Sequence, residues 1–71
     1  MQRNWVVDAR GLSCPQPVIL ARNAIQAGAF PIEVRVDTTT ALENVKRMAE
    51  RAGMTVHVEA VGDEFRLTIH K

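Results

Sequence analysis

The chain has 71 residues, with nine basic and eight acidic side chains and a net charge of +1 at pH 7. A chain this short forms one domain with a thin core and buries about 60% of its unfolded surface. The single cysteine excludes an internal disulfide framework and a cysteine-rich zinc site. The near-balanced charge provides little long-range attraction to nucleic acid.

The cellular compartment is predicted from the same features. One unpaired thiol suits a reducing environment. The first residues lead into only a few apolar side chains, which predicts neither a signal peptide nor a membrane span. We therefore expect a cytoplasmic protein.

The first predicted strand covers residues 5–9, where β-prone side chains alternate. A glycine turn follows at Gly11, and a helix is predicted from Pro15 to about Ala27, with Gly28 as its C-terminal stop. Ile19 falls on the polar side of this helix. The side chains expected to face the core are Pro17, Val18, Ala21, Ala24 and Ile25.

A second strand is predicted at residues 32–37, where apolar and charged residues alternate strictly. A second helix follows the three threonines that start at Thr38, and Thr40 with Glu43 has capping-box spacing. Glu43 and Arg47 have the spacing of an i,i+4 pair. The helix should end at Gly53, and its predicted apolar face consists of Ala41, Leu42, Val45, Met48, Ala49 and Ala52.

The last third of the chain predicts a β-hairpin, because residues 54–61 and 65–70 alternate on either side of Gly62-Asp63. A two-residue turn would set Glu59 opposite Arg66 on the outer face. It would also pair three apolar positions that face inward, namely Ala60 with Phe65, Val58 with Leu67, and Val56 with Ile69.

These elements predict an α/β fold of order βαβαββ. Right-handed crossovers place both helices on the same side of a mixed four-stranded sheet, which gives a two-layer sandwich with one open face. The open face is predicted to be polar, with charges of both signs and no aromatic side chain. Its residues are Asp8, Glu33, Arg35, Thr55, His57, Glu59, Arg66, Thr68 and His70.

Cys14 is the first candidate for chemistry. If Pro15 is the first helical residue, Cys14 is at the N-cap, where unpaired N–H groups and the helix dipole favour a thiolate. Arg10 would add a cation, and Ser13 is expected to be a turn residue rather than a nucleophile. The alternative is a small buried cysteine that only packs. The turn-forming residues around Cys14 favour the reactive interpretation.

The run around this cysteine resembles the signature of the TusA-like (SirA-like) sulfur-carrier proteins. It reads Asp8-x-Arg10-Gly11-x-x-Cys14-Pro15-x-Pro17. The length of the chain and the order of its predicted elements also match that family domain from end to end. Residues 37–69 are most similar to the N-terminal domain of YedF-like proteins, which usually carry a second domain. Residues 1–71 are thus expected to be one carrier domain, either complete or part of a longer protein.

The resemblance implies a function and roles for the motif residues. A persulfide donor such as a cysteine desulfurase would pass sulfane sulfur to Cys14. The resulting persulfide would serve an acceptor protein in tRNA thiolation, molybdenum-cofactor assembly, or sulfur or selenium metabolism. The chain would thus be a sulfurtransferase that works within a relay rather than as a stand-alone catalyst. Arg10 would assist electrostatically, Gly11 would allow the turn, and Pro15 and Pro17 would stiffen the start of the helix.

Several alternatives remain open. Asp8 and Arg10 either form a salt link that holds the loop or take part in catalysis. Ile19, one turn from the cysteine, is either an ordinary exposed residue or a docking point for a donor or acceptor. His57 and His70 share the outer face but lack further ligands, so neither a metal nor another cofactor is expected.

Two other classes of function compete with the sulfur carrier. One is a regulatory or interaction domain of a two-domain protein in which Cys14 is a redox sensor. The other is a small RNA-binding module that uses the open face of the sheet. The mixed charges and the lack of aromatic residues on that face weigh against the RNA-binding module.

Overall fold

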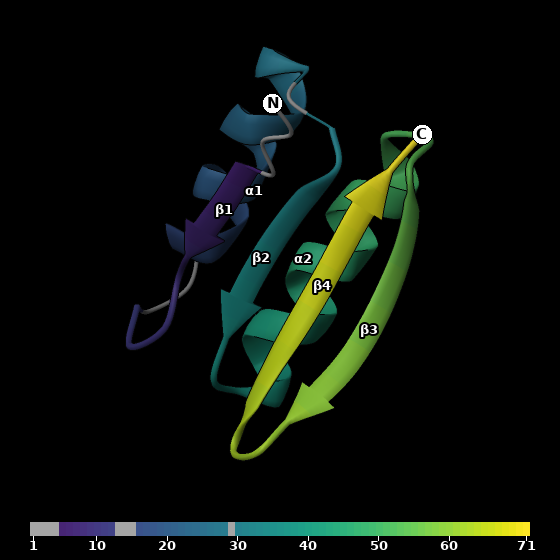
Figure 1. The fold of residues 1–71 in the computed structure, drawn as a ribbon. Coiled ribbons are helices and arrows are strands. Elements are labelled where there is room, and N and C mark those ends of the chain that lie inside the picture. Colours follow the sequence, from purple (N-terminus) through teal and green to yellow (C-terminus); the bar gives the residue numbers. More distant parts are fainter. Residues whose placement is uncertain (1–4, 13–15, 29) are drawn as a thin grey trace.

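The computed structural model describes residues 5–12, 16–28 and 30–71. For Trp5 it describes the backbone and not the side chain. Four strands and two helices follow one another in the predicted order (Figure 1). No helix in the described ranges has the length and apolar character needed to cross a membrane. The elements are β1 (Trp5–Asp8), α1 (Gln16–Ala27), β2 (Ile32–Val36), α2 (Thr39–Arg51), β3 (Thr55–Val61) and β4 (Glu64–His70).

The sheet is mixed, with strand order β1-β2-β4-β3. β1 is parallel to β2, whereas β4 is antiparallel to both β2 and β3. Both helices lie on the same side of the sheet (Figure 1), as right-handed strand–helix–strand crossovers require. The predicted fold class is confirmed. The sequence pattern did not indicate the strand order, in which β4 enters between β2 and β3.

The core lies between the helices and the two central strands. From β2 and β4 come Ile32, Val34, Val36, Leu67 and Ile69, all fully buried. The helices meet this layer mainly with small residues, which allow a close approach of helix to sheet. These are Ala21 and Ala24 of α1 and Ala41, Val45 and Ala49 of α2. The predicted apolar face of α1 is confirmed, because Pro17 is also buried and Val18 and Ile25 pack against the core.

The start of α2 differs from the prediction. Thr38 is the N-cap, and its hydroxyl accepts a hydrogen bond from the N–H of Ala41 at 3.1 Å. Thr40 is already inside the helix, so the capping box with Glu43 does not form. Three adjacent threonines offer equivalent caps, and the position where β2 ends selects the first of them. The salt bridges of the described residues also do not include one between Glu43 and Arg47.

The hairpin register is confirmed at every predicted pair, including Val58 opposite Leu67 and Glu59 opposite Arg66. The predicted burial of β3 is wrong, however, because Val58 and Ala60 are exposed, as is Ala52 at the end of α2. α2 leads directly into β3, so Met54 and Val56 at the start of the strand still pack against the core. The rest of β3 lies at the edge of the sheet, beyond the cover of the two helices.

Candidate functional site

The candidate site begins where β1 runs into a tight loop. The N–H of Ala9 donates to the carbonyl of Arg35 at 2.9 Å, which extends the pairing with β2 by one residue. The loop then turns at Gly11, whose φ of +75° lies in the left-handed region that glycine adopts without strain. The N–H of Leu12 closes the turn on the carbonyl of Ala9. The predicted glycine turn is present.

Arg10 anchors this loop through its side chain. Its Nε and Nη2 atoms donate to the two carboxylate oxygens of Asp8, each at 2.8 Å, in a bidentate pair. Its Nη1 atom donates to Glu64 Oε2 at 2.9 Å. Arg10 therefore joins β1 to the start of β4, which lies 54 residues further along the chain. The salt link between Asp8 and Arg10, one of the two alternatives expected from the sequence, forms.

The protonation of both partners reflects this geometry. The hydrogen bonds from the Arg10 side chain lower the pKa of Asp8 to about 2. The hydrogen bonds that Arg10 donates, first to Asp8 and then to Glu64, raise the pKa of Arg10 above its ordinary value. The guanidinium charge is thus shared between two carboxylates. An additional electrostatic role for Arg10 at the sulfur stays a prediction.

A second contact holds the loop from the end of β2. The N–H of Gly11 donates to Asp37 Oδ2 at 3.0 Å. Three segments that are far apart in the sequence therefore converge on the loop between β1 and α1. They surround an open hollow of about 450 Å³, lined by Asp8, Arg10, Gly11, Leu12, Asp37 and Glu64. Its charges are three carboxylates against one guanidinium.

The motif continues into α1, which begins at Gln16. Ser13, Cys14 and Pro15 lie outside the described residues, so the predictions for these three positions stay predictions. Pro17 is fully buried in the first turn of α1. No acidic side chain occupies that turn, so the positive end of the helix dipole is not offset there by a helix carboxylate.

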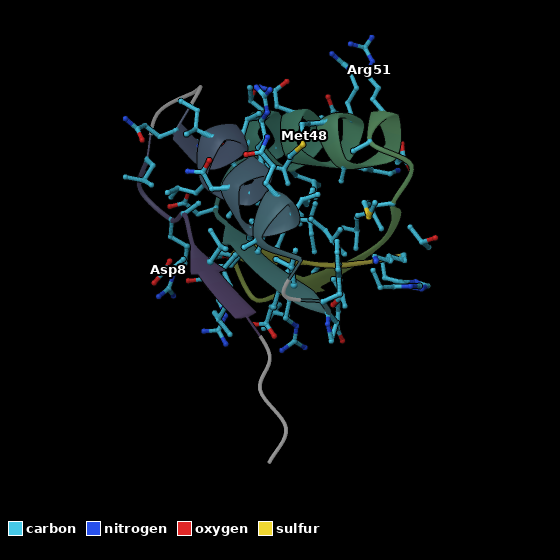
Figure 2. All side chains as sticks on the ribbon, turned by 90° about the horizontal axis from the view of Figure 1, so that it is seen from above. Asp8, Met48 and Arg51 are labelled. Atoms are coloured by element: carbon cyan, nitrogen blue, oxygen red, sulfur yellow. The ribbon has the colours of Figure 1, made fainter. Side chains whose placement is uncertain are left out.

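Ile19 lies on the solvent side of α1, where its side chain is 45% exposed. This agrees with its predicted place on the helix surface. Its role in docking stays a prediction. Figure 2 shows the same molecule from above, with Asp8 beside β1 and Arg51 projecting from α2 away from the sheet.

The open face of the sheet is crossed by ion pairs. Arg35 donates to Glu33 at 2.7 Å, and Arg66 donates to Glu59 at 2.6 Å. His57 and His70 stack, with ring centroids 5.3 Å apart. Within the described ranges, no three histidine, cysteine, aspartate or glutamate side chains gather closely enough to bind a metal ion.

Asp37 and Glu64 are site residues that the sequence pattern did not predict. A partial indication was available for Asp37, because the carboxyl ends of parallel neighbouring strands meet at the same edge of a sheet. Glu64 carried no such indication. It reaches Arg10 only because the register of β4 brings the start of that strand beside the end of β2.

Comparisons with known proteins agree with this architecture. The family model described as Sulfurtransferase TusA matches residues 6–71. A protein of Methanocaldococcus jannaschii named "Putative sulfur carrier protein" is 38% identical over 68 residues, which cover 92% of this chain and 91% of that protein. The crystal structure of a SirA-like protein from Desulfitobacterium hafniense has a TM-score of 0.83 and 29% identity, with 96% of each chain covered. The fold, the motif and a match over nearly the whole length agree, and the chain belongs to the TusA sulfurtransferase family.

Proposed function

We propose that this protein is a sulfur carrier that holds sulfane sulfur as a persulfide on Cys14. The observation that carries the proposal is the anchored loop between β1 and α1, which leads directly into the only cysteine. Arg10 and Gly11 tie this loop to Asp8, Asp37 and Glu64. Contacts with three segments hold this loop in place. A reactive side chain that partner proteins must reach is best carried by such a firmly held part of the backbone.

The transfer step needs no cofactor. The Cys14 thiolate attacks the outer sulfur of a donor persulfide, the sulfur–sulfur bond of the donor breaks, and the donor cysteine leaves as a thiolate. The new bond joins Cys14 to the transferred sulfur, which carries the negative charge. An acceptor thiolate reverses the same exchange, so no external oxidant or reductant is consumed. Amide groups at the start of α1 favour negative sulfur in both forms.

The partners follow from this chemistry. A cysteine desulfurase is the donor class, because it generates a protein-bound persulfide. The acceptor is a protein of tRNA thiolation, molybdenum-cofactor assembly, or sulfur or selenium metabolism. Ile19 is proposed as an apolar docking point on α1 for these partners, since its side chain is exposed. Residues 1–71 act as one carrier domain, either complete or part of a longer protein, in the cytoplasm, and this domain is most similar to the YedF-like branch.

The RNA-binding alternative is disfavoured by the open face of the sheet. Two arginines of that face, Arg35 and Arg66, are already paired with glutamates of the same face. A phosphate backbone would have to break these pairs, and the described part of this face has no phenylalanine, tyrosine or tryptophan side chain on which a base could stack.

The experiment that tests the proposal is sulfur loading. The protein is incubated with a cysteine desulfurase and cysteine, and its intact mass is measured under non-reducing conditions. We expect a gain of one sulfur atom that dithiothreitol removes and that cyanide converts to thiocyanate. The gain should be absent in Cys14→Ser. Ser13→Ala is the matched control, because it changes the neighbouring residue and leaves the thiol in place.

The same assay separates the alternatives. A redox sensor would be oxidised at Cys14 by peroxide but would neither gain sulfur from the desulfurase nor pass it on. A mass gain that persists in Cys14→Ser, or no gain in the folded wild-type protein, would refute the carrier function. Circular dichroism of each variant establishes that the fold is retained.

A further inference from the structure

β3 forms a long edge of the sheet whose one acidic side chain, Glu59, is paired with Arg66 of the neighbouring strand. It has seven residues and, among the residues that the structure describes, pairs only with β4, so one side of its backbone is open there. Natural edge strands are commonly protected by a lysine, a proline or a bulge. β3 has no lysine, arginine or proline, and its register with β4 runs from Thr55 to Val61 without interruption. The other edge strand, β1, has four residues within the described part of the chain.

The inner side of this edge is apolar and uncovered. Val58 is 42% exposed and Ala60 is also exposed, although both lie on the face that the helices cover elsewhere. At the next inward position, Val56 is only partly buried. An apolar strip therefore continues from the core to the open edge, where a further strand would extend it.

The hairpin geometry determines which backbone groups face the open edge. Val61 and Glu64 are the pair that closes the two-residue turn, and such a pair exchanges its hydrogen bonds across the hairpin. Because N–H and C=O groups alternate along a strand, the alternate residues Val56, Val58 and Ala60 direct theirs away from β4. The same three residues carry the uncovered apolar side chains.

We propose that β3 pairs antiparallel with β3 of a second copy of this chain, about a two-fold axis at Val58. Val58 is the central residue of the strand, so this register uses all seven residues. On the inner face it sets Val58 opposite its own copy and Val56 opposite Ala60. On the outer face it sets His57 opposite Glu59, twice by symmetry. The two sheets join into one, with both α2 helices on the same side.

Charge complementarity selects a second copy as the occupant. Glu59 already accepts a hydrogen bond from Arg66 at 2.6 Å in its own chain. In the proposed register it also faces an imidazole of the other chain, so each carboxylate has a donor on both sides. Cross-strand pairs of this kind stabilise antiparallel sheets, and like charges directly opposite one another destabilise them. The register places no two like charges directly opposite.

The pairing leaves the sulfur site accessible. β1 lies at the opposite edge of the sheet from β3 (Figure 1), so the loop around Arg10 would be at the outer end of each copy. The inference therefore does not depend on the chemistry of Cys14, and its tests use no sulfur transfer.

The first test is the mass of the protein in solution by sedimentation equilibrium. We expect a dimer of twice the 7.9 kDa chain mass. Val58→Lys should raise the dimer dissociation constant at least roughly tenfold, because symmetry sets two ammonium groups against each other. Val6→Lys is the matched control, since Val6 is 50% exposed on the other edge strand and should change the constant less than about twofold.

The second test reports the register directly. In a Cys14→Ser background, Val58→Cys places two thiols opposite each other with Cα atoms about 5.5 Å apart, which suits a disulfide. Mild oxidation should cross-link this variant. Val56→Cys should not cross-link, because its copy would lie about 13 Å away along the strand. A wild-type chain that stays monomeric to roughly 1 mM overturns the inference, as does equal cross-linking of the two variants.

Discussion

The two edges of the sheet are built in opposite ways. At the β1 edge the strand is short, and polar contacts from distant segments hold the following loop, with Arg10 reaching Glu64 and Gly11 reaching Asp37. At the β3 edge the strand is long, and its contacts are mainly the local ones of a hairpin. This fold therefore uses long-range polar contacts where a loop must be held still, and local pairing at the edge strand that is proposed to pair with a second copy of the chain.

The largest expected effect is the difference in unfolding free energy lost by a substitution in a central strand and by one in the β3 edge. Leu67 and Val58 are directly paired, but Leu67 is fully buried and Val58 is half exposed. Leu67→Ala should lower the free energy of unfolding by about 2 to 5 kcal/mol, because it leaves a cavity in the core. Val58→Ala should cost less than about 1 kcal/mol at protein concentrations where the chain is monomeric. Urea denaturation of both variants measures the difference. Equal losses would show that the edge strand is as well packed as the centre.

A smaller effect is expected from alanine at the two turn glycines. Gly11 and Gly62 have φ of +75° and +62°, and apart from the glycine itself and its two chain neighbours no atom lies within 4 Å of a Cβ added at either position. Each substitution should therefore cost only the backbone strain, about 1 to 2 kcal/mol. The two variants should differ in sulfur loading, because only Gly11→Ala disturbs the anchored loop. We expect sulfur loading to fall in Gly11→Ala and to stay near wild type in Gly62→Ala. Equal loading in both variants would argue against the role of the loop.

The polar anchoring of the β1 edge should be sensitive to acid. The hydrogen bonds from Arg10 lower the pKa of Asp8 from 3.8 to about 2, so the folded state binds this proton less readily than the unfolded state. The stability that this pair contributes is complete above the unfolded pKa and is lost as the pH falls through the folded pKa. The urea midpoint of the wild type should therefore fall between about pH 4 and pH 2. In Asp8→Asn, the urea midpoint should fall less over the same pH range.

Asp63→Asn is the control for this pH dependence. Asp63 lies in the turn between β3 and β4 and forms none of the salt bridges found among the described residues. This variant should keep the acid response of the wild type. Parallel pH profiles for wild type and Asp8→Asn would contradict the assigned role of the Arg10 pair.

The smallest effect on stability is expected on the surface of α1. Ile19→Asp should change the free energy of unfolding by less than about 1 kcal/mol, because the side chain is 45% exposed. Transfer from a cysteine desulfurase should nevertheless weaken, with a rise in KM. Val61→Asp is matched in exposure at 46% and lies on β3, so it should leave transfer unchanged. Normal transfer by Ile19→Asp would remove Ile19 from the docking surface.

Much of the fold was predictable because its patterns are local. Strict alternation located β2, helical periodicity located both apolar helix faces, and Gly62-Asp63 set a hairpin register that the structure reproduces pair by pair. The N-cap of α2 was not predictable to the residue, since three threonines in a row compete for it. The exposure of Val58 and Ala60 was missed because alternation indicates which face a side chain points to. It does not indicate whether another element covers that face.

For the candidate site, local sequence patterns were enough to predict the family motif, the glycine turn and a single cysteine shortly before a helix. The sharing of Arg10 between Asp8 and Glu64, and the contact of Asp37 with the N–H of Gly11, became evident from the fold. Asp37 reaches the loop because β2 lies beside β1, and Glu64 reaches it because β4 lies beside β2. A sheet order that depends on packing of the whole chain leaves no trace in the spacing of neighbouring residues.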